Sequence, residues 1–125
     1  MADNFIPDDV EDFIARHIDS IAQLEALLIL RAFSDERWDV ATLSKRLYIN
    51  EAETASILSG FCLNGFVSVS GDVFQYACDD EQKRLTIDSV AHTYSKHLIP
   101  LTQIVHAKSN KIRQFSEAFK FKRDT

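Results

Sequence analysis

The feature that most constrains the fold is a change in the spacing of apolar residues near the middle of the chain, at Gly65. Between residues 41 and 64, apolar side chains recur at the three- and four-residue intervals of amphipathic helices. Residues 66–70 and 73–78 are instead rich in strand-forming residues, and Gly71-Asp72 separates them. Two such runs joined by two turn residues predict a β-hairpin. The sequence therefore predicts a pair of helices followed directly by a hairpin.

Local signals predict where the helices begin. Asn50 is a good N-cap for the second helix of the pair, with Glu53 three positions later. Ser20, with Gln23 three positions later, opens an earlier helix in the same way. That earlier helix is apolar over most of its circumference, which is typical of a helix buried on several sides. Residues 37–40 are predicted to form a very short strand.

Two more helices are predicted to flank this core. One spans residues 7–18, and a long one spans residues 80–106. Pro100 lies inside the long helix and should kink it or split it in two. The predicted fold class is mainly α with a small β-hairpin: a winged helix-turn-helix with flanking N- and C-terminal helices. Residues 1–107 are expected to form one domain with its core at residues 20–78.

The helix pair and hairpin carry a family pattern. Residues 43–47 read LSKRL and residues 61–67 read FCLNGFV. These runs resemble the winged-helix core of MarR-type transcriptional regulators, which show a "Leu-Ala-x-x-Leu" helix and a recognition helix ending in "Leu-x-x-x-Gly-Leu-Val". The resemblance covers about residues 38–78. It implies a bacterial regulator whose recognition helix enters the DNA major groove.

The resemblance also implies a homodimer built from the terminal helices. The residues expected at such an interface are apolar positions on the first and last helices: Phe13, Ile14, Tyr94, Leu98, Leu101 and Ile104. A two-fold dimer would bring the same surface of both copies together.

The charge pattern departs from that of a typical DNA-binding face. No Lys or Arg occurs between Tyr48 and Asp72, whereas Glu51 and Glu53 add negative charge at the start of the recognition helix. DNA affinity depends largely on cations that contact phosphates. The sequence therefore favours a protein partner, with DNA binding as the alternative. The residues expected on the interaction face are Lys45, Arg46, Ala52, Ala55, Ser56 and Ser59.

Charge is divided unevenly along the chain. Residues 1–107 contain 17 Asp and Glu and 8 Lys and Arg, a net charge of −9, and residues 108–125 carry 6 Lys and Arg against 2 acids, a net charge of +4. The C-terminal segment is thus a basic amphipathic tail, with cations at Lys108, Lys111, Arg113, Lys120, Lys122 and Arg123. Packing of this tail on the acidic body, in the same chain or in a dimer mate, is favoured over a membrane anchor.

Catalytic and cofactor sites are not expected. His92 and His97 are five residues apart, which does not align them on one helix face, and no glycine-rich phosphate loop occurs. We therefore expect no enzymatic activity, cofactor, metal or small-molecule ligand. Cys62 and Cys78 have no CxxC spacing, and the chain shows neither a secretory signal nor an apolar run long enough to span a membrane. A cytoplasmic location is expected.

Overall fold

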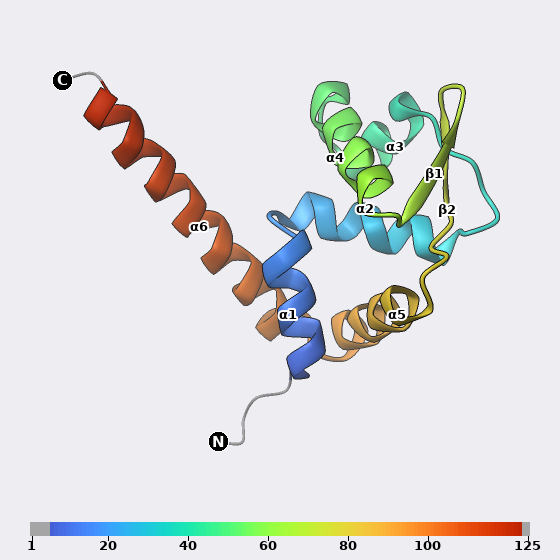
Figure 1. Cartoon of the computed structure of the whole chain (residues 1–125), viewed down its shortest axis with the longest axis horizontal. Helices are drawn as coiled ribbons and strands as arrows, with labels where there is room; N and C mark the ends of the chain where they lie inside the picture. The colour runs from blue at the N-terminus through green and yellow to red at the C-terminus, as the bar shows by residue number, and fades with distance from the viewer. Residues whose placement is uncertain (1–5, 124–125) are drawn as a thin grey trace.

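The computed structural model of the chain describes residues 6–123, and the side chains of residues 6–114. It is mainly helical with one small antiparallel hairpin, as predicted (Figure 1). Within the described residues, eight elements follow one another along the chain: α1 Asp8–His17, α2 Ile21–Ala32, α3 Val40–Leu47, α4 Glu51–Leu63, β1 Val67–Ser70, β2 Val73–Tyr76, α5 Glu81–Lys96 and α6 Leu98–Arg123.

The helix starts follow the capping signals. The side chains of Ser20 and Asn50 accept hydrogen bonds from the backbone N–H groups of Gln23 and Glu53, at 3.1 and 2.7 Å. Asp80 caps α5 in the same way. These contacts satisfy N–H groups that have no partner inside the helix. Each cap is encoded within four residues, which explains why the sequence predicts it.

The end of α4 and the hairpin form as the change of spacing predicts. Gly65 has a positive φ of 78°, and the backbone N–H of Phe66 donates to the carbonyl of Phe61 at 2.9 Å. This left-handed ending is favoured by glycine, because it has no Cβ to clash. The hairpin pairs Val67 with Tyr76, and Ser70 with Val73 across the Gly71-Asp72 turn.

The predicted strand at residues 37–40 is reduced to one bridge. Trp38 exchanges two backbone hydrogen bonds with Phe74, at 2.8 and 2.7 Å, which adds a third backbone segment beside β2. Asp39 does not continue this pairing. Its side chain accepts from the N–H of Thr42 and caps α3, so the helix begins one residue earlier than predicted, at Val40.

The predicted helix over residues 80–106 is split rather than continuous. α5 ends at Lys96, His97 lies between the two helices, and α6 begins at Leu98. Pro100 therefore occupies the first turn of a new helix, where its missing N–H costs nothing. Residues 108–123 are not a separate segment, because they continue α6 without interruption. This stretch contains neither glycine nor proline to end the helix.

The core surrounds α2, as its all-round apolar sequence predicts. Leu24, Leu27 and Leu30 of this helix are fully buried, and α2 contacts α3, α4, α6 and β2. α1 packs against the two C-terminal helices, α5 and α6. α6 begins within this assembly and then leaves it, so that its C-terminal half projects from the body (Figure 1).

Candidate interaction surface

The turn between α3 and α4 presents an aromatic side chain to solvent. Tyr48 has a left-handed backbone with a φ of 59°, and it is 93% exposed. Residues other than glycine rarely adopt this conformation. The backbone N–H of the next residue, Ile49, donates to the carbonyl of Ser44 at 3.2 Å, which holds the turn in place. The local fold thus maintains a strained residue whose ring contributes almost nothing to the core.

The outer side of α4 lies beside this tyrosine. Thr54, Ile57, Leu58 and Phe61 point into the core, and the opposite side is open to solvent. Leu63, at the C-terminal end of the helix, is 89% exposed. We call this surface the α4 face and define it by its exposed residues: Tyr48, Glu51, Ala52, Glu53, Ser56, Ser59 and Leu63. Two carboxylates and no cation belong to it.

Five of the six residues predicted for the interaction face are exposed on α3 and α4, but they do not form one uniform surface. Ala52, Ser56 and Ser59 lie on the α4 face, and Ala55 beside them is half-buried. Lys45 and Arg46 are exposed on the preceding helix. The guanidinium of Arg46 lies over the ring of Phe33, 5.3 Å from its centroid, so this cation is oriented toward α2.

The hairpin adds little positive charge to this region. Its tip consists of Gly71, with a φ of 64°, and the exposed carboxylate of Asp72. Arg37, in the segment before the Trp38 bridge, lines a shallow pocket with Ser68 and Ser70 on the side of the hairpin. The cations of this region therefore lie at its margins rather than on α4.

The residues predicted for a dimer interface separate into two groups. Phe13, Ile14 and Leu101 are buried in the core of their own chain, which makes their side chains unavailable to a partner. The remaining three stay accessible: Leu98 is exposed, and Tyr94 and Ile104 are half-buried. The helical spacing of apolar residues does not distinguish burial in the core from burial in an interface.

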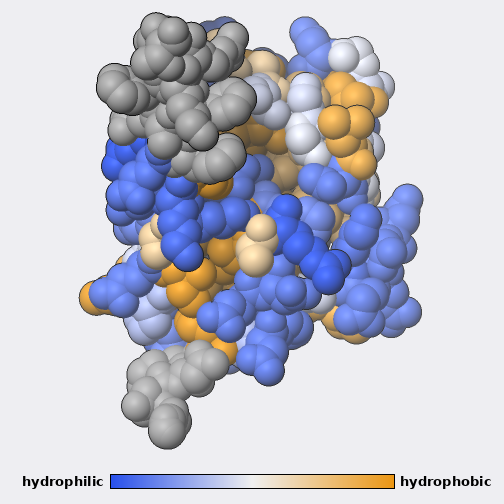
Figure 2. Space-filling model, turned by 60° about the vertical axis from the view of Figure 1, so that its left-hand side comes forward, coloured by the Kyte–Doolittle hydropathy of each residue, from blue (hydrophilic) through white to orange (hydrophobic). Residues whose placement is uncertain are grey.

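An apolar groove runs between α1 and α6. It has a volume of about 360 Å³, and its lining consists of Glu11, Ile14, Ala15, Ile104, Ala107, Lys108 and Lys111. Figure 2 shows the side of the molecule that carries these helices, where a hydrophobic patch is surrounded by hydrophilic side chains. A second apolar groove, of about 350 Å³, lies beside α2 and includes Phe33 and Tyr94.

The start of the basic tail is fixed to the body. The ammonium of Lys108 donates to the carbonyls of Ile14 and Ala15, at 2.8 and 2.6 Å, and pairs with the carboxylate of Asp19 at 3.0 Å. The hydroxyl of Ser109 donates to the backbone carbonyl of Asp19. Lys108 thereby satisfies carbonyls at the C-terminal end of α1, where the helix dipole favours a cation. We call these contacts the Lys108 clamp.

Among the side chains that the structure describes, the next two cations of the tail make no such contact with the body. Lys111 and Arg113 are exposed, and the Arg113 guanidinium donates only to the nearby Asn110 side chain, at 2.8 Å. Lys120, Lys122 and Arg123 lie beyond the residues whose side chains are described. Lys108 thus contacts Asp19 and α1 of its own chain, and the packing of the rest of the tail on the acidic body stays a prediction.

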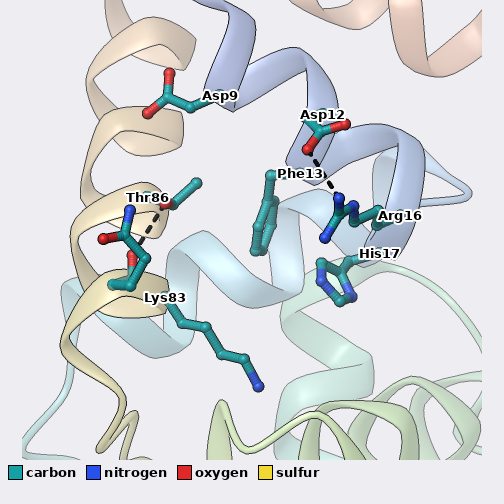
Figure 3. A pocket seen from close by; sticks show the side chains of 8 residues that line it. Asp9, Asp12, Phe13, Arg16, His17, Lys83 and Thr86 are labelled. Atoms are coloured by element: carbon teal, nitrogen blue, oxygen red, sulfur yellow. Dashed lines mark hydrogen bonds and ion pairs between the residues drawn. The ribbon is translucent and has the colours of Figure 1, made fainter.

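A polar cavity of about 260 Å³ between α1 and α5 was not predicted (Figure 3). α1 contributes Asp9, Asp12, Phe13, Arg16 and His17 to its lining, and α5 contributes Gln82, Lys83 and Thr86. Asp9 and Asp12 lie near the start of α1, where acids favour the helix dipole, and neither they nor His17 belong to a local motif. What brings them together is the packing of α1 against α5, some 70 residues later, which no local pattern encodes.

Aromatic rings and cations surround His17 in this cavity. Its imidazole packs against the rings of Phe13 and Phe66, with centroid distances of 4.9 and 5.3 Å. Burial lowers the pKa of His17, and the positive charges of Lys83, Arg16 and Lys108 lower it further. The electrostatic potential at the imidazole is therefore positive.

Among residues 6–114, whose side chains the structure describes, there is no group of three His, Cys, Asp or Glu residues arranged to hold a metal ion. No helix within residues 6–123 has the length and hydropathy needed to cross a bilayer. Cys62 and Cys78 are free thiols, and burial raises the pKa of both. No protein-family model matches the chain, and no curated protein matches it either.

Proposed function

We propose that this chain is a non-enzymatic regulatory protein that acts by binding another protein through the α4 face. The observation that carries the proposal is the composition of that face. It combines Glu51 and Glu53 with two large side chains, Tyr48 and Leu63, that are almost fully exposed. Tyrosine is enriched where protein interfaces concentrate their binding energy, and burial of an exposed leucine contributes roughly 1.5–3 kcal/mol.

The same composition argues against DNA as the main partner. A recognition helix that enters the major groove needs cations near the phosphates, and the resemblance to MarR-type regulators implies such a role. The α4 face has none, and Glu51 and Glu53 would repel phosphates at the N-terminus of the helix. The cations that support the DNA-binding alternative are Lys45 and Arg46, on α3.

We further propose that the protein is a homodimer in which the projecting half of α6 contacts a second copy. Ile112 is 44% exposed on this part of the helix, beside the exposed cations Lys111 and Arg113. An isolated helix of about 12–15 residues is only marginally stable in water, so a partner surface would stabilise it. The net negative charge of residues 1–107 favours contact with such a basic helix. Two free thiols favour the cytoplasm.

Site-specific photo-crosslinking tests the protein-binding proposal. A photoreactive phenylalanine analogue replaces Tyr48, and in a matched control it replaces His92, which is exposed on α5. Illumination of intact cells is expected to yield a protein adduct from position 48 that is absent from position 92. Leu63→Glu should abolish the adduct, because it places a charge in the apolar part of the surface.

Binding of a random-sequence DNA duplex at low and moderate salt tests the alternative. The proposal predicts that Lys45→Gln with Arg46→Gln leaves DNA binding unchanged. Any binding at low salt should disappear when Lys111, Arg113, Lys120, Lys122 and Arg123 are changed to Gln. Salt-dependent binding that requires Lys45 and Arg46, or nucleotide attached to the photoreactive residue, would establish the DNA-binding function instead.

A further inference from the structure

The cavity between α1 and α5 carries opposite charges at its two ends. His17 and Lys83 lie toward one end and Asp9 toward the other, with Phe13 between them (Figure 3). Asp12 and Arg16, at the rim, pair with each other at 3.4 Å, which leaves each less available to a ligand. A ligand that complements this lining needs an anionic group, a cationic group and an apolar part between them.

The basic end has hydrogen-bonding capacity to spare. The ammonium of Lys83 donates to the carbonyl of Asn64 at 3.0 Å and lies 5.9 Å from the centroid of the Phe66 ring. An ammonium has three N–H donors, so that two remain for a ligand. The imidazole of His17 makes ring contacts and no hydrogen bond with the described residues. A carboxylate placed here would meet donors from both side chains.

The acidic end of the cavity also has hydrogen-bonding groups available to a ligand. One oxygen of Asp9 accepts from the backbone N–H of Val10 at 2.9 Å, and the other has no partner among the described residues. Gln82 and Thr86 line the cavity from α5 and supply an amide and a hydroxyl. The Thr86 hydroxyl donates to the carbonyl of Gln82, which leaves its oxygen free to accept.

The separation of the two ends sets the size of the ligand. Asp9 and His17 are eight residues apart on α1, which corresponds to about 12 Å along the helix axis. Three extended residues of polypeptide span at most about 10–11 Å, and the flexible side chains of Asp9 and Lys83 can close the difference. The volume of about 260 Å³ is smaller than the pockets that hold drug-sized ligands, which are roughly 300–1,000 Å³.

We propose that this cavity binds a short free peptide of about three residues, with its terminal ammonium at Asp9 and its terminal carboxylate between His17 and Lys83. An apolar central side chain packs against the edge of Phe13, and the peptide groups meet Gln82 and Thr86. This site is independent of the α4 face, so that the two proposals stand or fall separately.

Three versions of one tripeptide test the pairing of both ends. Free Gly-Leu-Gly is compared with its N-acetylated form, which lacks the ammonium, and its C-amidated form, which lacks the carboxylate. Nuclear magnetic resonance of the full chain follows the ring protons of His17 and the backbone amide of Thr86. The free peptide is expected to bind with a Kd of about 1 mM, and each blocked form about three- to fivefold more weakly.

Asp9→Asn and Asp8→Asn form a matched pair of variants. Both residues are exposed acids in the first turn of α1, but only Asp9 lines the cavity. Asp9→Asn should weaken binding of the free peptide to the level of the acetylated form and should not affect the acetylated form itself. Asp8→Asn should leave all three affinities unchanged. Both sites are on the surface, so that loss of folding does not complicate the comparison.

The imidazole gives an independent readout of the carboxylate. Arg16, Lys83 and Lys108 face His17 with positive charge, and Asp12 lines the same cavity. A bound carboxylate should raise the pKa of His17, so that binding tightens as pH falls from about 7.5 to 6. Lys83→Met should weaken the free and acetylated peptides equally and spare the amidated one. Equal binding of all three peptides, or no perturbation at His17 by the free peptide, would overturn the proposal.

Discussion

At the scale of single residues, Tyr48 shows that this fold tolerates backbone strain at an exposed position. A left-handed residue other than glycine costs about 1 kcal/mol, and the ring makes almost no contact that would offset this cost. The sequence predicts the turn that contains Tyr48, because Asn50 marks the next helix. It does not predict the left-handed backbone, because tyrosine is not among the residue types that favour this conformation.

Tyr48→Asn should stabilise the protein, because asparagine adopts the left-handed conformation more readily than tyrosine. We expect the free energy of unfolding in urea to rise by about 0.5–1 kcal/mol. Tyr48→Ala keeps the strain and removes the ring, so it should leave the free energy of unfolding nearly unchanged. The same variant should no longer bind the protein that crosslinking from position 48 identifies. A loss of stability in Tyr48→Asn would show that the ring has a structural role.

Tyr76 carries a hydroxyl whose burial is not compensated. This oxygen has no hydrogen-bond partner in the described part of the chain, and burial raises the pKa of Tyr76 to about 12. Removal of an unpartnered buried hydroxyl costs little and often stabilises. Tyr76→Phe should therefore leave the free energy of unfolding unchanged or raise it by up to about 1 kcal/mol. A clear loss in chemical denaturation would contradict this expectation.

His17 should make stability depend on pH. Burial and neighbouring cations lower its pKa below the ordinary value of 6.5, so the unfolded chain binds the proton more readily than the folded chain. The stability that neutral His17 contributes is complete above that value and is lost as pH falls toward the folded-state pKa. The midpoint of thermal unfolding should therefore drop between about pH 7.5 and 5. His17→Gln should flatten this profile, whereas the exposed control His92→Gln should not.

At the scale of elements, the sequence predicts what is encoded locally and misses what depends on tertiary contacts. Caps at Ser20 and Asn50 and the Gly65 ending need only a few neighbouring residues. The helix break at His97 is displaced from Pro100, because proline is favourable in a first turn and the helix therefore restarts before it. The cavity lining and the burial of Ile14 and Leu101 depend on how α1, α5 and α6 pack, which no short pattern records.

The Lys108 clamp should stabilise the junction of α1 and α6. Lys108→Met removes donors to two carbonyls and the pairing with Asp19, while it keeps the aliphatic chain. We expect the free energy of unfolding to fall by about 1–2 kcal/mol. Lys111→Met is the matched control, because Lys111 is exposed one turn later, and its effect should be close to zero. Equal effects of the two variants would show that the clamp does not hold in solution.

At the scale of the whole molecule, the division of charge should control assembly. The net charge of −9 over residues 1–107 and +4 over residues 108–125 make attraction between copies sensitive to salt. Light scattering should report a dimer near 0.1 M salt and a shift toward monomer near 1 M. Ile112→Asp should be monomeric in both, and Gln103→Asp, on an exposed position of the anchored half of α6, should remain dimeric. A monomer at low salt would overturn the homodimer proposal.

The Lys108 clamp also fixes the rotational phase of everything that follows it on α6. Helical residues advance by about 100° each, so one residue inserted after Ser109 would turn the rest of the helix by more than a quarter of a revolution. Seven inserted residues, close to two full turns, would nearly restore the original direction while they lengthen the projection by about 10 Å. The clamp is thus a fixed point on α6. The number of residues inserted after it sets both the length and the direction of the C-terminal part of the helix, and the two can be varied separately.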